Sequence, residues 1–132
     1  MAVDSGACAH VTPANVFSMT CEETAESKAG HKWYGAEGTS ILNMGLQKVA
    51  GQDDKGKPIT IKFNVASKLT RPLMSVWEMA ENGNEVGFAK GRGWINSVSG
   101  HTTELRAEGK LWFLDIWVQV PREISNSHFA RQ

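Results

Sequence analysis

Cysteine is scarce in this chain, and its scarcity limits both the fold and the compartment. There are two cysteines among 132 residues, Cys8 and Cys21. Two cysteines cannot build the set of several disulfides that holds many small secreted domains together. Reduced thiols in a reducing compartment are the simpler interpretation, so we expect an intracellular, cytoplasmic protein.

An excess of charge of one sign and long apolar runs are also lacking. Lys plus Arg and Asp plus Glu number 14 each, so no basic surplus indicates nucleic acid or an anionic membrane as a partner. Apolar runs such as residues 111–114 are far shorter than the roughly 20 residues that span a bilayer. Asp4, Ser5 and Gly6 stand where a signal peptide would be apolar. We therefore expect this domain to bind neither nucleic acid nor membrane.

The residues that are present favour one compact, β-rich domain. A chain of 132 residues fits a single domain, and 41% of its residues are hydrophobic. Strict apolar–polar alternation over residues 59–65 predicts a half-buried strand, and residues 53–57 have the composition of a tight hairpin turn. Ser75 followed by Glu78 is a capping box, and Gly83 is a stop signal, so one short helix is expected between them.

Other turn residues divide the rest of the chain into further short strands. Glycine-containing turns separate expected strands at 39–42, 46–49, 85–88, 94–98, 102–106 and 111–118. The first two of these are expected to be hinged at Asn43-Met44-Gly45. The domain is expected at 1–118, with a core at about 2–90 and a β-rich extension at 91–118, followed by a polar tail or linker at 119–132. The sequence thus predicts an all-β fold with one short α-helix.

Asp4-Ser5-Gly6 is the sharpest local feature, because it follows the apolar residues Ala2 and Val3. Aspartic proteases present a catalytic carboxylate in such a turn. The glycine allows a tight loop, and the hydroxyl can bond across to a partner loop. The tripeptide alone is a weak signal, since Asp, Ser and Gly are ordinary turn residues.

A longer stretch resembles a known family. Residues 3–11 (VDSGACAHV) resemble the active-site segment of copia-type retrotransposon proteases, which commonly run Asp-Ser-Gly-Ala, two residues, then His. Further segments resemble that family in its order and spacing over roughly residues 2 to 118. Residues 36–39, with Gly45 and Val49, resemble the flap hairpin of the family. Residues 71–76, with Gly83 and 86–88, resemble the segment where an apolar strand meets a short helix. Residues 105–106 and 109–112 resemble the sequence that follows the protease core.

The resemblance implies a retropepsin-like, closed β-barrel-like domain and an aspartic endopeptidase that processes a polyprotein, with no cofactor. It also implies roles for individual residues. These are Asp4 as the catalytic carboxylate, Ser5, Gly6 and Ala7 as support of the active-site loop, and His10, Met44 and Gly45 as substrate-groove candidates, the last two at the flap tip.

The implied chemistry requires two chains. Two carboxylates about 3 Å apart share one proton, so one acts as base toward water while the other hydrogen-bonds the scissile carbonyl. This chain has one Asp-Ser-Gly. Asp53 and Asp54 lie in the charged turn, and Asp115 lacks a following Ser/Thr-Gly. A homodimer that contributes one Asp4 from each protomer is therefore expected, with a peptide or polyprotein as substrate.

The chain departs from the family near its first residue. Only residues 1–3 precede the catalytic loop, whereas related proteases have an N-terminal strand or hairpin there that helps to build the dimer interface. The segment 94–118 is expected to replace it, since an exposed apolar surface favours a partner. Its apolar candidates are Trp112, Phe113, Ile116 and Trp117. The alternative is a catalytically silent, monomeric module that holds a peptide in its groove or by strand addition.

Two other chemistries are disfavoured by spacing. Cys8, His10, Cys21 and His31 do not form the close ligand pairs of structural zinc sites, so no metal site is expected. Asp4 and Ser5 are neighbours whose side chains diverge, which argues against a serine triad.

Overall fold

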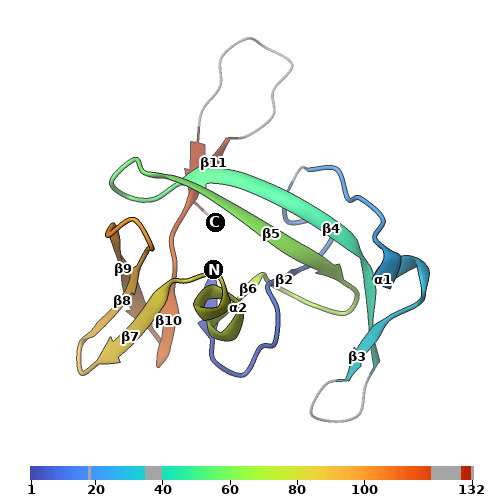
Figure 1. Cartoon of the computed structure of the whole chain (residues 1–132), viewed down its shortest axis with the longest axis horizontal. Coiled ribbons are helices and arrows are strands. Elements are labelled where there is room, and N and C mark those ends of the chain that lie inside the picture. Colours follow the sequence, from blue (N-terminus) through green and yellow to red (C-terminus); the bar gives the residue numbers. More distant parts are fainter. Residues whose placement is uncertain (18, 35–39, 120–128, 132) are drawn as a thin grey trace.

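A computed structural model of the chain describes residues 1–17, 19–34, 40–119 and 129–131 (Figure 1). Its two helices are α1 (Ala25–Lys28) and α2 (Val76–Glu81). Its strands are β1 (Ala2–Asp4), β2 (Val11–Thr12), β3 (Lys32–Tyr34), β4 (Ser40–Gln52), β5 (Pro58–Ala66), β6 (Leu73–Ser75), β7 (Glu85–Ala89), β8 (Arg92–Asn96), β9 (Thr102–Glu108), β10 (Leu111–Phe113), β11 (Trp117–Gln119) and β12 (Phe129–Arg131). Neither described helix has the length and apolar character needed to cross a membrane.

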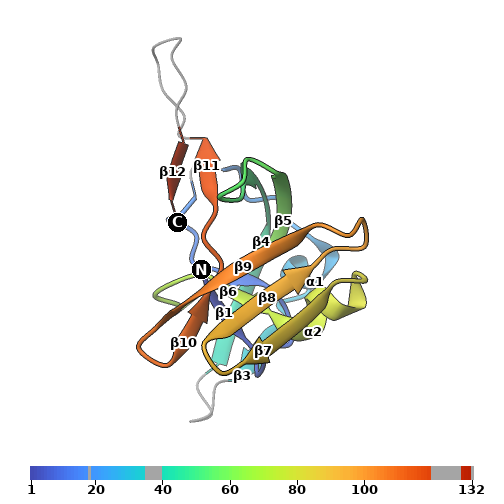
Figure 2. The same cartoon turned by 90° about the vertical axis from the view of Figure 1, so that its left-hand side faces the viewer.

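The strands form a mixed sheet that is open rather than closed into a barrel. The order is β12-β11-β4-β5-β2-β6-β1-β10-β9-β8-β7, with β3 added to β4. Within the described ranges the terminal strands β12 and β7 do not pair with each other, so the closed barrel that the resemblance implied is corrected. The all-β class is confirmed. In Figure 2, β7, β8, β9 and β10 lie side by side on the face turned toward the viewer.

The β4–β5 hairpin follows from the sequence pattern. Val49 pairs with Ile61 and Gln47 pairs with Phe63, so the apolar positions of the alternating segment lie on the buried face. The turn at 53–57 joins the strands, and the backbone N–H of Asp53 donates to the carbonyl of Lys57 at 2.9 Å. The predicted half-buried strand and its turn are both confirmed.

Met44 and Gly45 lie inside β4, so the predicted hinge at this point is wrong. The strand continues past a β-bulge between Asn43 and Gly45, where Gly45 adopts a φ of 133°. Glu22 and Leu46 exchange backbone hydrogen bonds of 2.8 Å, which bring the chain before α1 against the bulge. The segment 36–39, predicted as part of a flap hairpin, lies outside the described residues, although β3 and β4 on either side of it pair antiparallel.

The predicted helix is α2. Ser75 is its N-cap, and the Ser75 hydroxyl accepts the backbone N–H of Glu78 at 3.0 Å. The fold has a second helix besides the one expected: α1 is a four-residue helix in which Thr24 and Ser27 form a capping box. It lies within 18–32, the polar stretch whose composition fits either a surface connection or a short helix. Because α1 is short and buries no residue, its formation depends on this local cap rather than on apolar periodicity.

The segment that follows β9 packs against other strands of the same chain, with β10 beside β1 and β11 beside β4. The predicted strand at 111–118 is divided into β10 and β11 by residues 114–116. Leu114 still continues the antiparallel pairing of β10 with β1, since its N–H donates to the carbonyl of Met1 at 2.8 Å. Leu114 and Ile116 are buried, and β11 pairs with β4. In the stretch expected to be a polar tail or linker, β12 pairs with β11, and residues 120–128 and 132 lie outside the described part.

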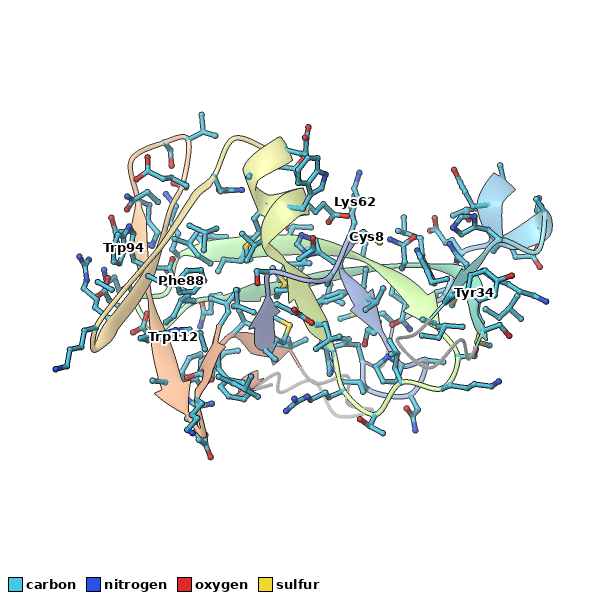
Figure 3. All side chains as sticks on the ribbon, turned by 90° about the horizontal axis from the view of Figure 1, so that it is seen from below. Cys8, Tyr34, Lys62, Phe88, Trp94 and Trp112 are labelled. Carbon is cyan, nitrogen blue, oxygen red and sulfur yellow. The ribbon has the colours of Figure 1, made fainter. Side chains whose placement is uncertain are left out.

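Tryptophan rings on the β7–β10 face lie over glycines. A Cβ on Gly87 would come within 2.1 Å of the Trp94 ring, and one on Gly93 within 2.8 Å of Trp112. Phe88 packs beside Trp112 with ring centroids 6.0 Å apart (Figure 3). The rings of Trp94 and Trp112 are therefore half-buried by their own sheet, and much of their surface is unavailable to a partner.

Candidate active-site loop and its surroundings

Asp4 is the last residue of β1, a strand held on both sides. Its neighbours are β6, which runs parallel with Asp4 opposite Ser75, and β10, which runs antiparallel. The Asp4 carboxylate is half-buried, and its Oδ1 atom accepts the backbone N–H of Gly6 at 2.8 Å. Ser5 and Gly6 are exposed. A carboxylate thus stands at the end of a central strand, at the edge of solvent.

The loop that follows Asp4 crosses the end of β6. Strands β1 and β2 pair with opposite sides of β6, so residues 5–10 pass from one side to the other. Ser75 holds this loop at two points: its hydroxyl donates to the carbonyl of Ala7 at 2.7 Å, and its N–H donates to Nδ1 of His10 at 2.8 Å. Ser75 is fully buried, which makes these contacts a rigid support.

His10 is buried, and its two ring nitrogens have defined partners. Since Nδ1 accepts the Ser75 N–H, the neutral ring carries its proton on Nε2, which lies 2.7 Å from Oε2 of Glu78. Burial lowers the pKa of His10 to about 4 and raises the pKa of Glu78. His10 therefore links the loop, β6 and α2 as a neutral hydrogen-bonding residue.

The other groove candidates lie elsewhere in the fold. Met44 is exposed and Gly45 is buried, both within β4. In the described part of the chain no hydrogen bond or ion pair joins either residue to Asp4. The structure thus brings together Asp4, Ser75 and His10, but not Asp4 with the expected flap tip.

A cavity of about 880 Å³ opens between β5, α2 and the β8–β9 hairpin. Its walls include Ile59 and Ile61 of β5, Met79 of α2, Ile95 of β8 and His101 before β9. His10 borders it, but Asp4, Ser5, Gly6 and Ala7 are not among the residues that line it. The hollow is therefore distinct from the Asp-Ser-Gly loop.

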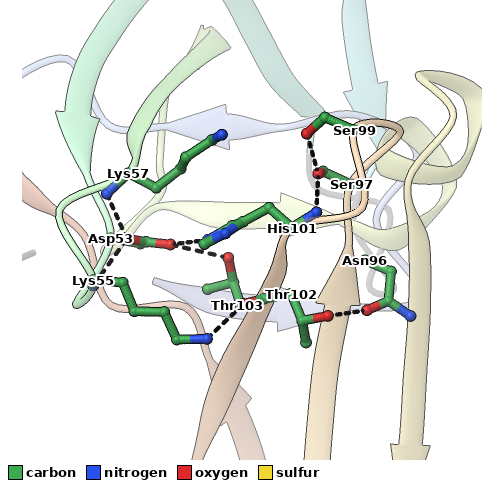
Figure 4. Close-up of polar contacts among 9 residues, drawn as sticks. All are labelled: Asp53, Lys55, Lys57, Asn96, Ser97, Ser99, His101, Thr102 and Thr103. Atoms are coloured by element: carbon green, nitrogen blue, oxygen red, sulfur yellow. Dashed lines mark hydrogen bonds and ion pairs between the residues drawn. The ribbon is translucent and has the colours of Figure 1, made fainter.

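The sequence reasoning missed a second polar cluster at one end of this cavity (Figure 4). Asp53 is buried, and its Oδ2 atom lies 2.6 Å from Nε2 of His101 and 3.3 Å from the hydroxyl of Thr103. Its Oδ1 atom accepts the backbone N–H groups of Lys55 and Lys57 at 2.9 and 2.8 Å. Nothing local in the sequence signals that the partner of this turn aspartate lies 48 residues away.

The hydrogen bonds to Asp53 favour its ionised form. Burial by itself raises the pKa of this carboxyl, but the hydrogen bonds from His101, Lys57 and Lys55 outweigh it, and the pKa lies below its usual value. Lys55 Nζ adds a 3.0 Å bond to the carbonyl of Thr102. The cluster fastens the tip of the β4–β5 hairpin to the start of β9.

Cys8 and Cys21 are both exposed free thiols. Among the residues that the structure describes, no group of three or more His, Cys, Asp or Glu side chains is arranged to hold a metal ion. Comparison of the chain with family models, with curated proteins and with solved structures found no match.

Proposed function

We propose that this chain is one subunit of a homodimeric aspartic endopeptidase of the retropepsin type that acts on a peptide or polyprotein. The supporting observation is the position of Asp4. Its carboxylate stands at the end of a strand paired on both sides, on a loop that Ser75 holds at Ala7 and His10, while Ser5 and Gly6 face solvent. A reactive carboxylate needs such rigid support together with open access.

In the proposed mechanism, two Asp4 carboxyl groups share one proton across the dimer axis. The ionised carboxylate takes a proton from water as the water attacks the scissile carbonyl carbon. The protonated carboxyl donates a hydrogen bond to the carbonyl oxygen. The proton taken from water then passes to the departing amine as the C–N bond breaks, so no cofactor is consumed. The two pKa values belong to the pair.

The requirement for a second copy rests on the surroundings of the other aspartates. Asp53 is buried in its own cluster, and Asp115 accepts two hydrogen bonds from Arg106, at 2.8 and 3.1 Å. Asp54 is exposed in the hairpin turn. Trp77, which is 65% exposed and lies in the first turn of α2 next to the supported loop, offers an apolar contact for the partner.

A catalytically silent module that holds a peptide is the second candidate. It is favoured by the cavity of about 880 Å³ that lies apart from the Asp-Ser-Gly loop. A groove without a catalytic carboxylate in its wall suits binding better than cleavage.

Substitution of Asp4 distinguishes the two candidates. Asp4→Asn keeps the size of the side chain and an oxygen for the Gly6 N–H but removes the base, so peptide cleavage should cease while the melting temperature is retained. Asp54→Asn is the matched control and should cleave normally. Cleavage by the Asp4→Asn protein at the wild-type rate would refute the proposed enzyme.

A further inference from the structure

One edge of β5 is largely unpaired. β4 pairs with β5 from Pro58 to Ala66, but on the other side β2 pairs only with Asn64 and Val65. Within the described residues, no strand covers positions 58–63 on that side. The open stretch, 58–63, is six residues long, or roughly 20 Å at the rise of a strand.

The hydrogen-bond pattern identifies the free backbone groups. The N–H of Asn64 donates to the carbonyl of His10 at 2.9 Å, on the side away from β4. In an antiparallel pair these directions alternate along the strand, so the N–H and C=O groups of Lys62 and Thr60 point to the same side. The part of the chain that the structure describes offers neither residue a backbone partner there. Free groups of this kind are a template for another strand.

This edge borders the cavity described above. Residues from Lys57 to Lys62 line it on one side, and Met79, Ile95 and Leu114 contribute to its other walls. At about 880 Å³ the hollow is as large as the clefts in which proteins commonly enclose ligands. A strand added to β5 would find apolar walls on one of its faces.

The exposed face of the edge is basic. Lys62 lies directly opposite Lys48 of β4 in a pair without mutual backbone bonds, where side chains approach most closely. Both lysines are exposed, and like charges directly opposite each other disfavour the pairing. Lys57 adds a third positive charge, and Figure 3 shows Lys62 projecting on the side where α2 lies. Glu78 is the acidic group lining the cavity, and His10 hydrogen-bonds it.

We propose that the edge of β5 at 58–63 binds an extended, acidic segment of another polypeptide, which adds a strand beside Thr60 and Lys62. Backbone bonds hold the segment, and the alternation of its side chains sets the preference. Side chains on one face meet Ile59 and Ile61 and are apolar. Those on the other face lie beside Lys62, one strand further from Lys48, and are carboxylates, which offset the positive charge of the two lysines.

This site does not depend on catalysis by Asp4, so it is tested in the full chain with Asp4→Asn, which cannot consume the probe by the proposed mechanism. The probe is a fluorescein-labelled peptide with alternating Val and Glu, and a peptide with alternating Val and Lys is its control. Fluorescence polarisation should show saturable binding of the acidic peptide, weakened by salt, and binding of the basic peptide that is at least about tenfold weaker.

Two variants locate the binding edge. Thr60→Pro removes an outward N–H at a position where an edge strand tolerates proline, and Lys62→Glu reverses the charge. Each should weaken binding at least about tenfold, whereas Lys90→Glu, on the exposed β7–β8 turn, should change it less than about twofold. Hydrogen exchange of the backbone amides locates the bound peptide without the Thr60→Pro variant. In the Asp4→Asn protein, the peptide should slow exchange of the Thr60 and Lys62 amides.

Three results would overturn the proposal: equal binding of the two peptides, unchanged binding by Lys62→Glu, or protection confined to other strands. Self-association of the probe-free chain that Lys62→Glu abolishes would also overturn it, because the edge would then belong to a second copy.

Discussion

Nδ1 of His10 accepts the backbone N–H of Ser75 at 2.8 Å, so the residue that caps α2 also fixes the end of the loop that carries Asp4. The bond requires a neutral imidazole, because a protonated Nδ1 has no lone pair to offer. The integrity of the loop is thereby coupled to the protonation of a buried histidine.

This coupling predicts that the folded state loses stability in mild acid. The pKa of His10 falls from 6.5 in the unfolded chain to about 4 in the fold, so the unfolded state binds the proton first. The contribution of neutral His10 to the free energy of unfolding is therefore complete above pH 6.5 and is lost as the pH falls to about 4. The loss should be about 3 kcal/mol. Burial raises the pKa of Glu78 above the ordinary 4.5, so the folded state binds that proton first and gains stability as the pH falls toward 4.5.

Urea unfolding at several pH values between 7 and 4 measures this effect. His10→Asn should lower stability at pH 7 and flatten its dependence on pH, whereas the same change at the exposed His31 should leave the slope intact. An unaltered slope in His10→Asn would show that another group is responsible.

The loss of stability in acid should also affect the pH dependence of any activity. A carboxyl dyad is active on the acidic side of neutrality, so unfolding should make the cleavage rate fall more steeply at the acidic end of its pH profile.

The Asp53 cluster predicts a contrast between adjacent aspartates. Asp53→Ala removes an acceptor shared by two turn N–H groups, His101 and Thr103, and should cost about 2–4 kcal/mol of unfolding free energy. Asp54→Ala, at an exposed neighbour, should stay within about 0.5 kcal/mol. Denaturant titration of both variants tests this, and equal losses would mean that Asp53 in its cluster stabilises the fold no more than its exposed neighbour does.

The same cluster predicts a second pH dependence. Because the pKa of Asp53 is depressed, its contribution is present above the ordinary value of 3.8 and is lost as the pH falls through the lower folded value. Below about pH 4, the free energy of unfolding should therefore fall less steeply with pH in Asp53→Ala than in the wild-type protein. This pH range lies below the range in which His10 acts.

Gly45 is predicted to be a residue of the fold rather than a moving hinge. A Cβ at Gly45 would lie 2.4 Å from the carbonyl oxygen of Glu22, and its φ of 133° disfavours other residues. Gly45→Ala should therefore lower stability by several kcal/mol, on the order of 3 or more. Gly56→Ala is the control: φ is also positive, at 77°, but no heavy atom lies within 4 Å, so its cost should be about 1 kcal/mol. Similar melting temperatures for the two variants would contradict this account.

Local patterns in the sequence predicted the elements whose causes are local. The alternation over residues 59–65, the turn at 53–57 and the Ser75 cap each specify their structure within a few residues, and β5, its hairpin and α2 are found there. The Asp-Ser-Gly turn belongs to this group, because the Gly6 N–H bonds the side chain of Asp4 two residues away.

The features that sequence reasoning missed depend on distant partners. The sequence suggested a hinge at Gly45 because it does not show that Glu22 fixes the bulge there. The strand expected at 111–118 is divided because β10 pairs with β1 whereas β11 pairs with β4. The apolar residues proposed for a second protomer partly serve this chain's own core, with Ile116 completely buried. Periodicity reports that a side chain is buried but does not say which chain buries it.

We propose that one catalytic centre takes a carboxylate from each of two chains. This proposal is tested most directly by measuring peptide cleavage in mixtures of wild-type and Asp4→Asn protein, unfolded together and refolded at constant total concentration. If both chains supply Asp4 and mixed dimers are inactive, activity follows the square of the wild-type fraction, so an equal mixture retains about one quarter of full activity. Activity proportional to the wild-type fraction, with about one half retained, would contradict the account, because each chain would then act alone.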